Sequence, residues 1–194
     1  SPFEMVKFAF DEYEWVPTQF FKRGKQEARI YGKVISWLTE EEKTKQKEIP
    51  NEGYNFPLSG IIGKYPKEEL SNGKPFGGGT PTADIFVISR NLLIDRLGEQ
   101  HFEEVQFSRK GTKQRTKENM QERLEQTRIQ DCWRWKRCWE EDLKIILIGY
   151  KFNFKKEEKE LKKAFDETES SGPHFFIFGW PDYFEEPKPP NFVF

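Results

Sequence analysis

The chain has 194 residues, of which 35% are hydrophobic and 34% are charged, and its formal net charge is −1. This composition is typical of a globular protein and excludes a disordered one, and the length fits a single domain around one sizeable core. A net charge near zero gives the molecule as a whole no attraction to nucleic acid or acidic membranes, so a charge-driven partner must be met locally.

Two further features bear on where the protein works. No run of the sequence approaches the roughly 18 uninterrupted apolar residues that a membrane span needs, so we expect no membrane partner. Cys132 and Cys138 are six residues apart in a segment with helical spacing, which places them on different faces. Two unpaired thiols predict an intracellular protein, cytoplasmic or nuclear, although a cysteine-poor secreted protein would have a similar composition.

The N-terminal quarter of the chain predicts two strands and one helix. Apolar residues alternate with other residues from Phe3 to Phe10, which is the pattern of a half-buried strand. Residues Ala28 to Leu38 also alternate and predict a second strand. Thr39 followed three residues later by Glu42 is a capping box, so a short charged helix is expected to run to about Lys47.

Residues 50–81 are rich in Gly, Pro and Asn and have little periodic pattern. They predict a long loop region. Loops of this length inside a domain are often functional, but disorder explains the composition equally well.

Order returns in the second half of the chain. A short β-branched run predicts a strand from Ala83 to Ser89, and alternation predicts another from Phe102 to Phe107. From about 112 to 142 the apolar period becomes helical, which predicts one long helix that buries residues Leu124, Trp135 and Trp139. The apolar run from Lys144 to Tyr150 predicts a fully buried strand.

The last third adds an amphipathic helix, a strand and a tail. Leu161, Ala164 and Phe165 share one face of the helix predicted from Lys155 to Phe165. A final strand is expected from Phe175 to Phe178, and residues 181–194 form an extended Pro-rich tail. The predicted fold is therefore α/β: one globular domain over 1–180 with a mixed sheet of about five to six strands, one long helix and one or two shorter ones.

Residues 77–150 resemble part of a known family. The run Gly79 to Ile88, with Asp84 at its centre, is followed by Glu104-Val105-Gln106. This order is similar to the PD-(D/E)XK nuclease core, in which an Asp and a Glu on neighbouring strands hold a divalent metal. The resemblance implies that Asp84 and Glu104 bind Mg²⁺ or Mn²⁺ for phosphodiester cleavage. The family's Lys two residues beyond the Glu is Gln106 here, and Lys110 is the displaced alternative, so the predicted catalytic set is Asp84, Glu104, Gln106 and Lys110.

The segment from Val105 to Trp139 is locally basic, with ten Lys or Arg residues against four Asp or Glu. Cations beside an exposed indole can pair with phosphates and stack a base. A solvated helix with internally balanced charges and core tryptophans explains the same pattern. The nucleic-acid-binding residues predicted from this segment are Arg109, Lys113, Arg128, Trp133, Arg134, Lys136 and Arg137.

Two other patterns bear on function. His101, Cys132, Cys138 and His174 are residue types that bind zinc, but they lack the closely spaced pairs of compact sites, so buried thiols and ordinary histidines are predicted instead. The aromatic tail can insert into a partner's groove or fold back over its own sheet. The leading prediction is thus a nucleic-acid-binding domain with metal-dependent nuclease activity, and the alternative is a non-enzymatic adaptor that binds protein through its aromatic helix or tail.

Overall fold

The computed structural model describes residues 25–66, 79–104 and 117–192. The predicted strand from Phe3 to Phe10 lies outside these residues. The described part is a single α/β domain with one mixed sheet of five strands, as the sequence predicts. The strands, in sheet order, are β1 (Tyr54–Pro57), β2 (Thr82–Val87), β3 (Leu92–Arg96), β4 (Lys144–Ile148) and β5 (Phe175–Phe178).

The sheet combines two kinds of pairing. Strands β1, β2 and β3 form an antiparallel meander, whereas β4 and β5 run parallel to β3. Parallel neighbours need long crossover connections, and these are the helices α4 (Lys117–Glu140) and α5 (Phe154–Glu167). Two helices precede the sheet, α2 (Lys25–Trp37) and α3 (Glu40–Lys47).

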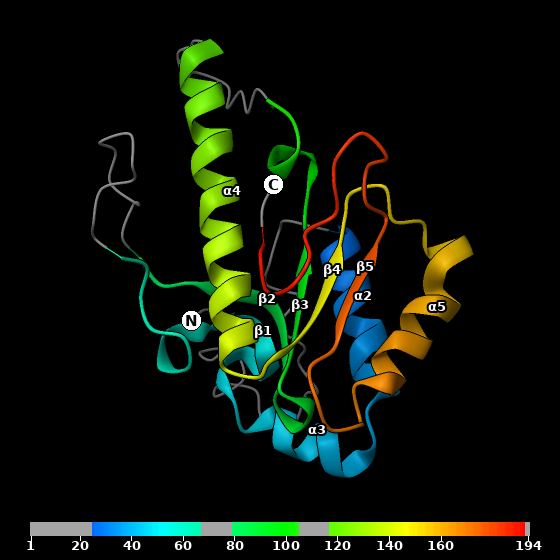
Figure 1. Cartoon of the computed structure of the whole chain (residues 1–194). Helices are drawn as coiled ribbons and strands as arrows, with labels where there is room; N and C mark the ends of the chain where they lie inside the picture. Colours follow the sequence, from blue (N-terminus) through cyan, green and yellow to red (C-terminus); the bar gives the residue numbers. More distant parts are fainter. Residues whose placement is uncertain (1–24, 67–78, 105–116, 193–194) are drawn as a thin grey trace, which may run out of the picture.

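Helices cover both faces of the sheet (Figure 1). On one face α2 and α5 lie side by side over a core that includes Ile94, Ile146 and Phe165. On the other face α4 and the C-terminal segment cover a second core around Leu93, Leu147 and Trp135. Because β3 and β4 are buried from both sides, their sequences are continuous apolar runs rather than alternating ones.

Several predicted elements are confirmed. The capping box at Thr39 is present, since Thr39 Oγ1 accepts from Glu42 N–H and the Glu42 carboxylate accepts from Thr39 N–H. Strand β5 has the predicted bounds, and β2, β4, α4 and α5 match their predictions with shifts at the ends. Trp135 is fully buried, but Leu124 and Trp139 are only half-buried, which corrects the predicted core of α4.

The strand predicted from Ala28 to Leu38 is wrong, because these residues belong to α2 and its end. Ile30, Val34 and Leu38 are buried at intervals of four residues, which is the spacing of one helix face. The loop predicted over 50–81 is also partly wrong, because it contains β1, while residues 67–78 lie outside the described part.

The strand predicted from Phe102 to Phe107 is wrong where it is described. Residues 102–104 follow a short 3-10 turn, η5 (Glu99–His101), and belong to no strand. The strand that follows β2 in the chain and pairs with it is β3, to which the sequence patterns assign no element. It begins directly after a tight turn at Ile88–Arg90 that ends at Asn91 in the left-handed conformation, with φ 48°.

Candidate functional site

Asp84 and Asp95 lie opposite each other on β2 and β3, one step beyond the paired residues Ile85 and Ile94. The backbone pairing of β2 with β3 ends at Ile85 and Ile94, and beyond it the two carboxylates accept hydrogen bonds from backbone N–H groups. The backbone N–H of Asp84 donates to Asp95 Oδ1 over 3.2 Å, and the backbone N–H of Arg96 donates to Asp84 Oδ2 over 2.7 Å. Two acidic side chains are therefore fixed at the ends of neighbouring strands.

Helix α4 presents two donors to Asp95 from consecutive positions. Arg134 Nη2 donates to Asp95 Oδ2 over 2.6 Å, and Trp135 Nε1 donates to the same oxygen over 3.0 Å. Asp95 is buried, so these charge-assisted and neutral hydrogen bonds compensate the loss of water around its carboxylate.

The network continues along α4 away from the sheet. Arg134 Nη2 also donates to Asp131 Oδ1 over 3.0 Å, and the other oxygen of Asp131 lies 2.5 Å from His101 Nδ1. Burial opposes the charge of Arg134, but Asp95 and Asp131 outweigh it and raise the pKa of Arg134 well above its usual value. Within the described residues, Arg134 Nε is a buried side-chain nitrogen with no hydrogen-bond partner.

Asp84 carries the most perturbed carboxyl of this group. Burial, followed by the negative charge of Asp95, raises its pKa from 3.8 to about 7, and Glu27 on α2 adds to the shift. The hydrogen bond from Arg96 N–H acts in the opposite direction. A carboxyl whose pKa lies near 7 because of burial and a neighbouring carboxyl is a feature of functional sites, since a proton or a cation relieves the repulsion of such a pair.

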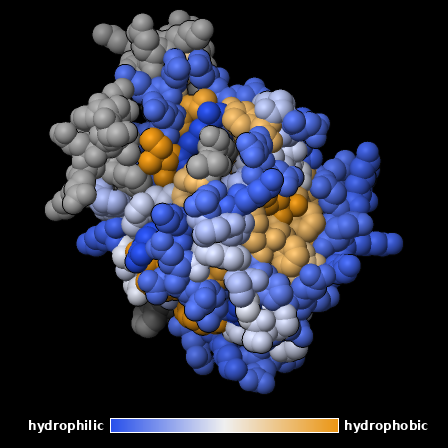
Figure 2. All heavy atoms as spheres, viewed as in Figure 1, coloured by the Kyte–Doolittle hydropathy of each residue, from blue (hydrophilic) through white to orange (hydrophobic). Residues whose placement is uncertain are grey.

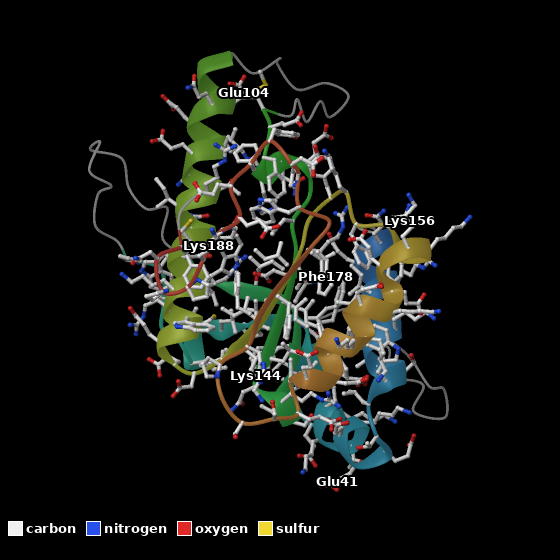
Figure 3. The ribbon with its side chains drawn as sticks, turned by 45° about the vertical axis from the view of Figure 1, so that its right-hand side comes forward. Glu41, Glu104, Lys144, Lys156, Phe178 and Lys188 are labelled. Atoms are coloured by element: carbon white, nitrogen blue, oxygen red, sulfur yellow. The ribbon has the colours of Figure 1, made fainter. Side chains whose placement is uncertain are left out.

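The predicted partner of Asp84 was misplaced. Glu104 is exposed, lies outside any strand, and stands near the N-terminal end of α4 (Figure 3). Asp95 occupies the neighbouring strand instead. Two residues beyond Asp95, where the resemblance expects a lysine, stands the buried Leu97. Gln106 and Lys110 lie outside the described residues.

The predicted nucleic-acid contacts are largely engaged within the domain. Arg134 pairs with Asp95 and Asp131 in the network and its side chain is only 13% exposed, and Arg128 donates to the carbonyls of His101 and Phe102. Trp133 packs on Tyr65 with ring centroids 5.1 Å apart. Arg137 pairs with Glu140, whereas Lys136 is exposed on α4. Arg109 and Lys113 lie outside the described residues.

The other candidate ligands do not converge. Cys132 and Cys138 are free thiols, and burial raises the pKa of each to about 12, so both are protonated at neutral pH. Among residues 25–66, 79–104 and 117–192, no three His, Cys, Asp or Glu side chains form a group that could hold a metal ion. No helix in the same ranges is long and apolar enough to cross a membrane.

The aromatic tail packs on the domain where it is described. Trp180 and Phe192 are buried, and the Phe192 ring lies 5.4 Å from that of Phe175 on β5 and 6.3 Å from that of Trp135. Folding back over the molecule was one of the two alternatives for this segment.

The chain matches no protein-family model, no curated protein and no solved structure, so only its own residues indicate its function.

Proposed function

We propose that this chain is a nucleic-acid-binding domain in which Asp84 and Asp95 hold a divalent metal ion, Mg²⁺ or Mn²⁺, for phosphodiester cleavage. The observation that carries the proposal is the facing pair of carboxyls at the ends of β2 and β3, with the pKa of Asp84 raised to about 7. A divalent cation between two such groups relieves their repulsion and replaces the proton.

The donor set fits a hard cation. Mg²⁺ in phosphate chemistry is commonly held by one or two carboxylates, with water and substrate phosphate as its other ligands. Asp84 and Asp95 provide two carboxylates, and water and substrate phosphate would be the other ligands. When bound, such an ion activates water and neutralises charge that develops on the phosphate.

The residues around Asp84 and Asp95 have separate roles in the proposed site. Trp135 and Arg134 orient Asp95 through its Oδ2, and the backbone of Arg96 orients Asp84. Leu97 supplies no charge where the resemblance expects a lysine, so we assign the role of the cation to Arg134, which pairs with Asp95. The two free thiols favour a reducing compartment, and we therefore place this activity inside the cell, in the cytoplasm or nucleus.

Cleavage of labelled single-stranded and duplex oligonucleotides with added Mg²⁺ or Mn²⁺ tests the proposal. Asp84→Asn is expected to lower the rate by more than about 100-fold, because even outer-shell partners of metal sites are worth about 10- to 100-fold. Asp166→Asn is the matched control, since Asp166 is an exposed acid on α5 that pairs with Lys162. Equal rates for Asp84→Asn and the wild type, or no cleavage by the wild type with either metal, would overturn the proposal.

A protein-binding role has one supporting observation. Strand β5 is the last in the sheet order, and its four residues, Phe175–Phe178, are all partly exposed. Figure 2 shows hydrophobic residues at the surface beside α5, in the region of β5. An apolar edge strand can accept a strand from another protein, so a change of hydrogen exchange confined to β5 on binding a partner would favour the adaptor role.

A further inference from the structure

A pocket of about 440 Å³ lies between the beginnings of α2 and α5. Its lining residues come from both helices and from the loop that follows β4: Gln26, Arg29, Lys151, Phe152, Asn153, Phe154 and Lys155. Both helices start at this end of the molecule, where Lys156 marks the first turn of α5 (Figure 3). The volume is within the range of about 300 to 1,000 Å³ that is usual for ligand sites.

The rim of this pocket is cationic and its floor is aromatic. Arg29, Lys151 and Lys155 are exposed, whereas Phe152 and Phe154 are buried beneath them. The Arg29 guanidinium lies over the Phe154 ring, 4.2 Å from its centroid, which holds that cation in place. Lys151 pairs with Asp182 at 3.8 Å, but the Asp182 side chain is 99% exposed, so this pair is weak and exchangeable.

The backbone fixes the loop that carries Lys151. Gly179 has a φ of 59°, and a Cβ at this position would lie 2.2 Å from the backbone nitrogen of Phe152. Only glycine allows this close approach between the end of β5 and the loop after β4. Lys151 and the pocket floor are therefore held by packed backbone.

An exposed aromatic ring adjoins the pocket. Tyr183 is 55% exposed, and Lys151 Nζ lies 5.1 Å from the centroid of its ring. The Tyr183 hydroxyl donates to Glu103 Oε1 and lies 2.6 Å from the Tyr150 hydroxyl, so the ring is anchored at its polar end. A held and exposed ring beside cations is the arrangement on which single-stranded nucleic acids stack a base.

The pocket also connects to the carboxyl pair. Arg96 Nη2 donates to Gln26 Oε1 over 2.6 Å, and the backbone N–H of the same Arg96 donates to Asp84. The loop after β4 and the end of β3 lie at the carboxyl ends of parallel strands, which is where open α/β sheets bind ligands.

We infer that this pocket and Tyr183 form a groove for single-stranded nucleic acid, in which Arg29, Lys151 and Lys155 bind a backbone phosphate and Tyr183 stacks an adjacent base. The choice of nucleic acid as the ligand rests on the proposed function. The groove itself requires no metal, and its binding is therefore measured without divalent ions.

Fluorescence anisotropy of the full chain with a labelled oligothymidylate in EDTA tests the inference. Arg29→Gln with Lys151→Gln is expected to weaken binding and to reduce the salt slope by about 0.7 for each phosphate that no longer pairs with a cation. Tyr183→Ala is expected to weaken binding by roughly 5-fold or more, whereas Tyr183→Phe, which keeps the ring, is expected to retain most of the affinity. All of these side chains are exposed, and thermal melting by circular dichroism checks that each variant folds.

Lys163→Gln is the matched control, because Lys163 is an exposed cation on α5 outside the pocket lining. Wild-type affinity of the pocket variants, or equal binding of a duplex and a single strand, would overturn the inference. If inorganic phosphate displaces the oligothymidylate completely and Tyr183→Ala does not weaken binding, the pocket binds free phosphate. That result would overturn the inference of a groove for single-stranded nucleic acid. Binding without Mn²⁺-dependent cleavage would leave the groove in place and contradict only the metal site.

Discussion

Asp84 makes the stability of the protein depend on pH in a window of its own. Its folded pKa of about 7 lies above its usual 3.8, so between these values the folded chain holds a proton that the unfolded chain has lost. Stability from this group is present at low pH and falls as pH rises through the folded pKa. Urea unfolding across about pH 4 to 8 should show this decline in the wild type and a flatter profile for Asp84→Asn. Identical profiles would mean that folding does not raise the pKa of Asp84.

Arg90 is a buried cation outside the candidate site whose removal should lower the stability of the fold strongly. It is buried, pairs with Glu42 at 2.8 Å, donates to the Phe165 carbonyl and lies over the Phe165 ring. Arg90→Ala removes a donor from the buried Phe165 carbonyl and the cation that pairs with Glu42, and it should lower the free energy of unfolding by about 3 to 5 kcal/mol. Arg137→Ala removes an exposed pair with Glu140 and should cost about 0 to 1 kcal/mol. Equal midpoints in urea for the two variants would contradict this account.

The same ion pair acts in a different pH window from Asp84. Burial favours a higher pKa for Glu42, but hydrogen bonds from Arg90 and Thr39 outweigh it and lower the pKa to about 2. A lowered carboxyl pKa stabilises the fold above its usual value of 4.5, and this contribution is lost as pH falls toward 2. Acid unfolding below about pH 4 should therefore be more gradual in Arg90→Ala than in the wild type.

At the scale of elements, α4 links the core to the candidate site. Trp135 is fully buried in the core and also donates to Asp95. Trp135→Ala should lower the free energy of unfolding by about 3 to 5 kcal/mol, whereas Lys136→Ala, at the neighbouring exposed position, should change it by less than about 0.5 kcal/mol. Guanidinium unfolding of both variants measures the difference. An unchanged midpoint for Trp135→Ala would show that Trp135 does not pack in the core.

The predictable elements are those with a strong local signal. The capping box at Thr39 and the apolar run of β4 depend on adjacent residues, and both can be identified from sequence. The apolar residues of α2 fit both the two-residue period of a strand and the four-residue spacing of a helix face. Only the packing of Ile30 and Val34 in the core distinguishes the helix from the strand. Strand β3 follows β2 after a very short turn, so its apolar residues are not separated from the preceding run.

The candidate site was half predictable for a physical reason. Asp84 stands at the start of a strand, where a polar residue in an apolar run is visible in the sequence. Its partner depends on which strand lies beside β2, which is a long-range property. Once β3 is placed there, Asp95 faces Asp84 and Glu104 does not. The ion pairs of Arg134 with Asp95 and Asp131 likewise depend on how α4 crosses the sheet, so its basic charge alone does not indicate these partners.

At the scale of the whole molecule, helices cover both faces of the sheet, so the candidate sites lie at the ends of the strands. Asp84 and Asp95 lie opposite each other on β2 and β3, and the cationic pocket lies at the starts of α2 and α5. A metal ion bound to the acidic pair would add positive charge there, and the cations of the pocket would bind phosphate. In this way a protein with a net charge of −1 can bind a polyanion locally.

Titration of Mn²⁺ followed by electron paramagnetic resonance tests the central claim that Asp84 and Asp95 bind a divalent metal. The ion competes with the proton on Asp84, so affinity should rise as pH increases from about 6 to about 8. Asp84→Asn should lose this binding, while Asp166→Asn should retain it. Binding of Mn²⁺ that is lost in Asp84→Asn and strengthens with pH is the result that the account predicts. Equal binding by the wild type and Asp84→Asn, or no binding by the wild type at the higher pH, would contradict it.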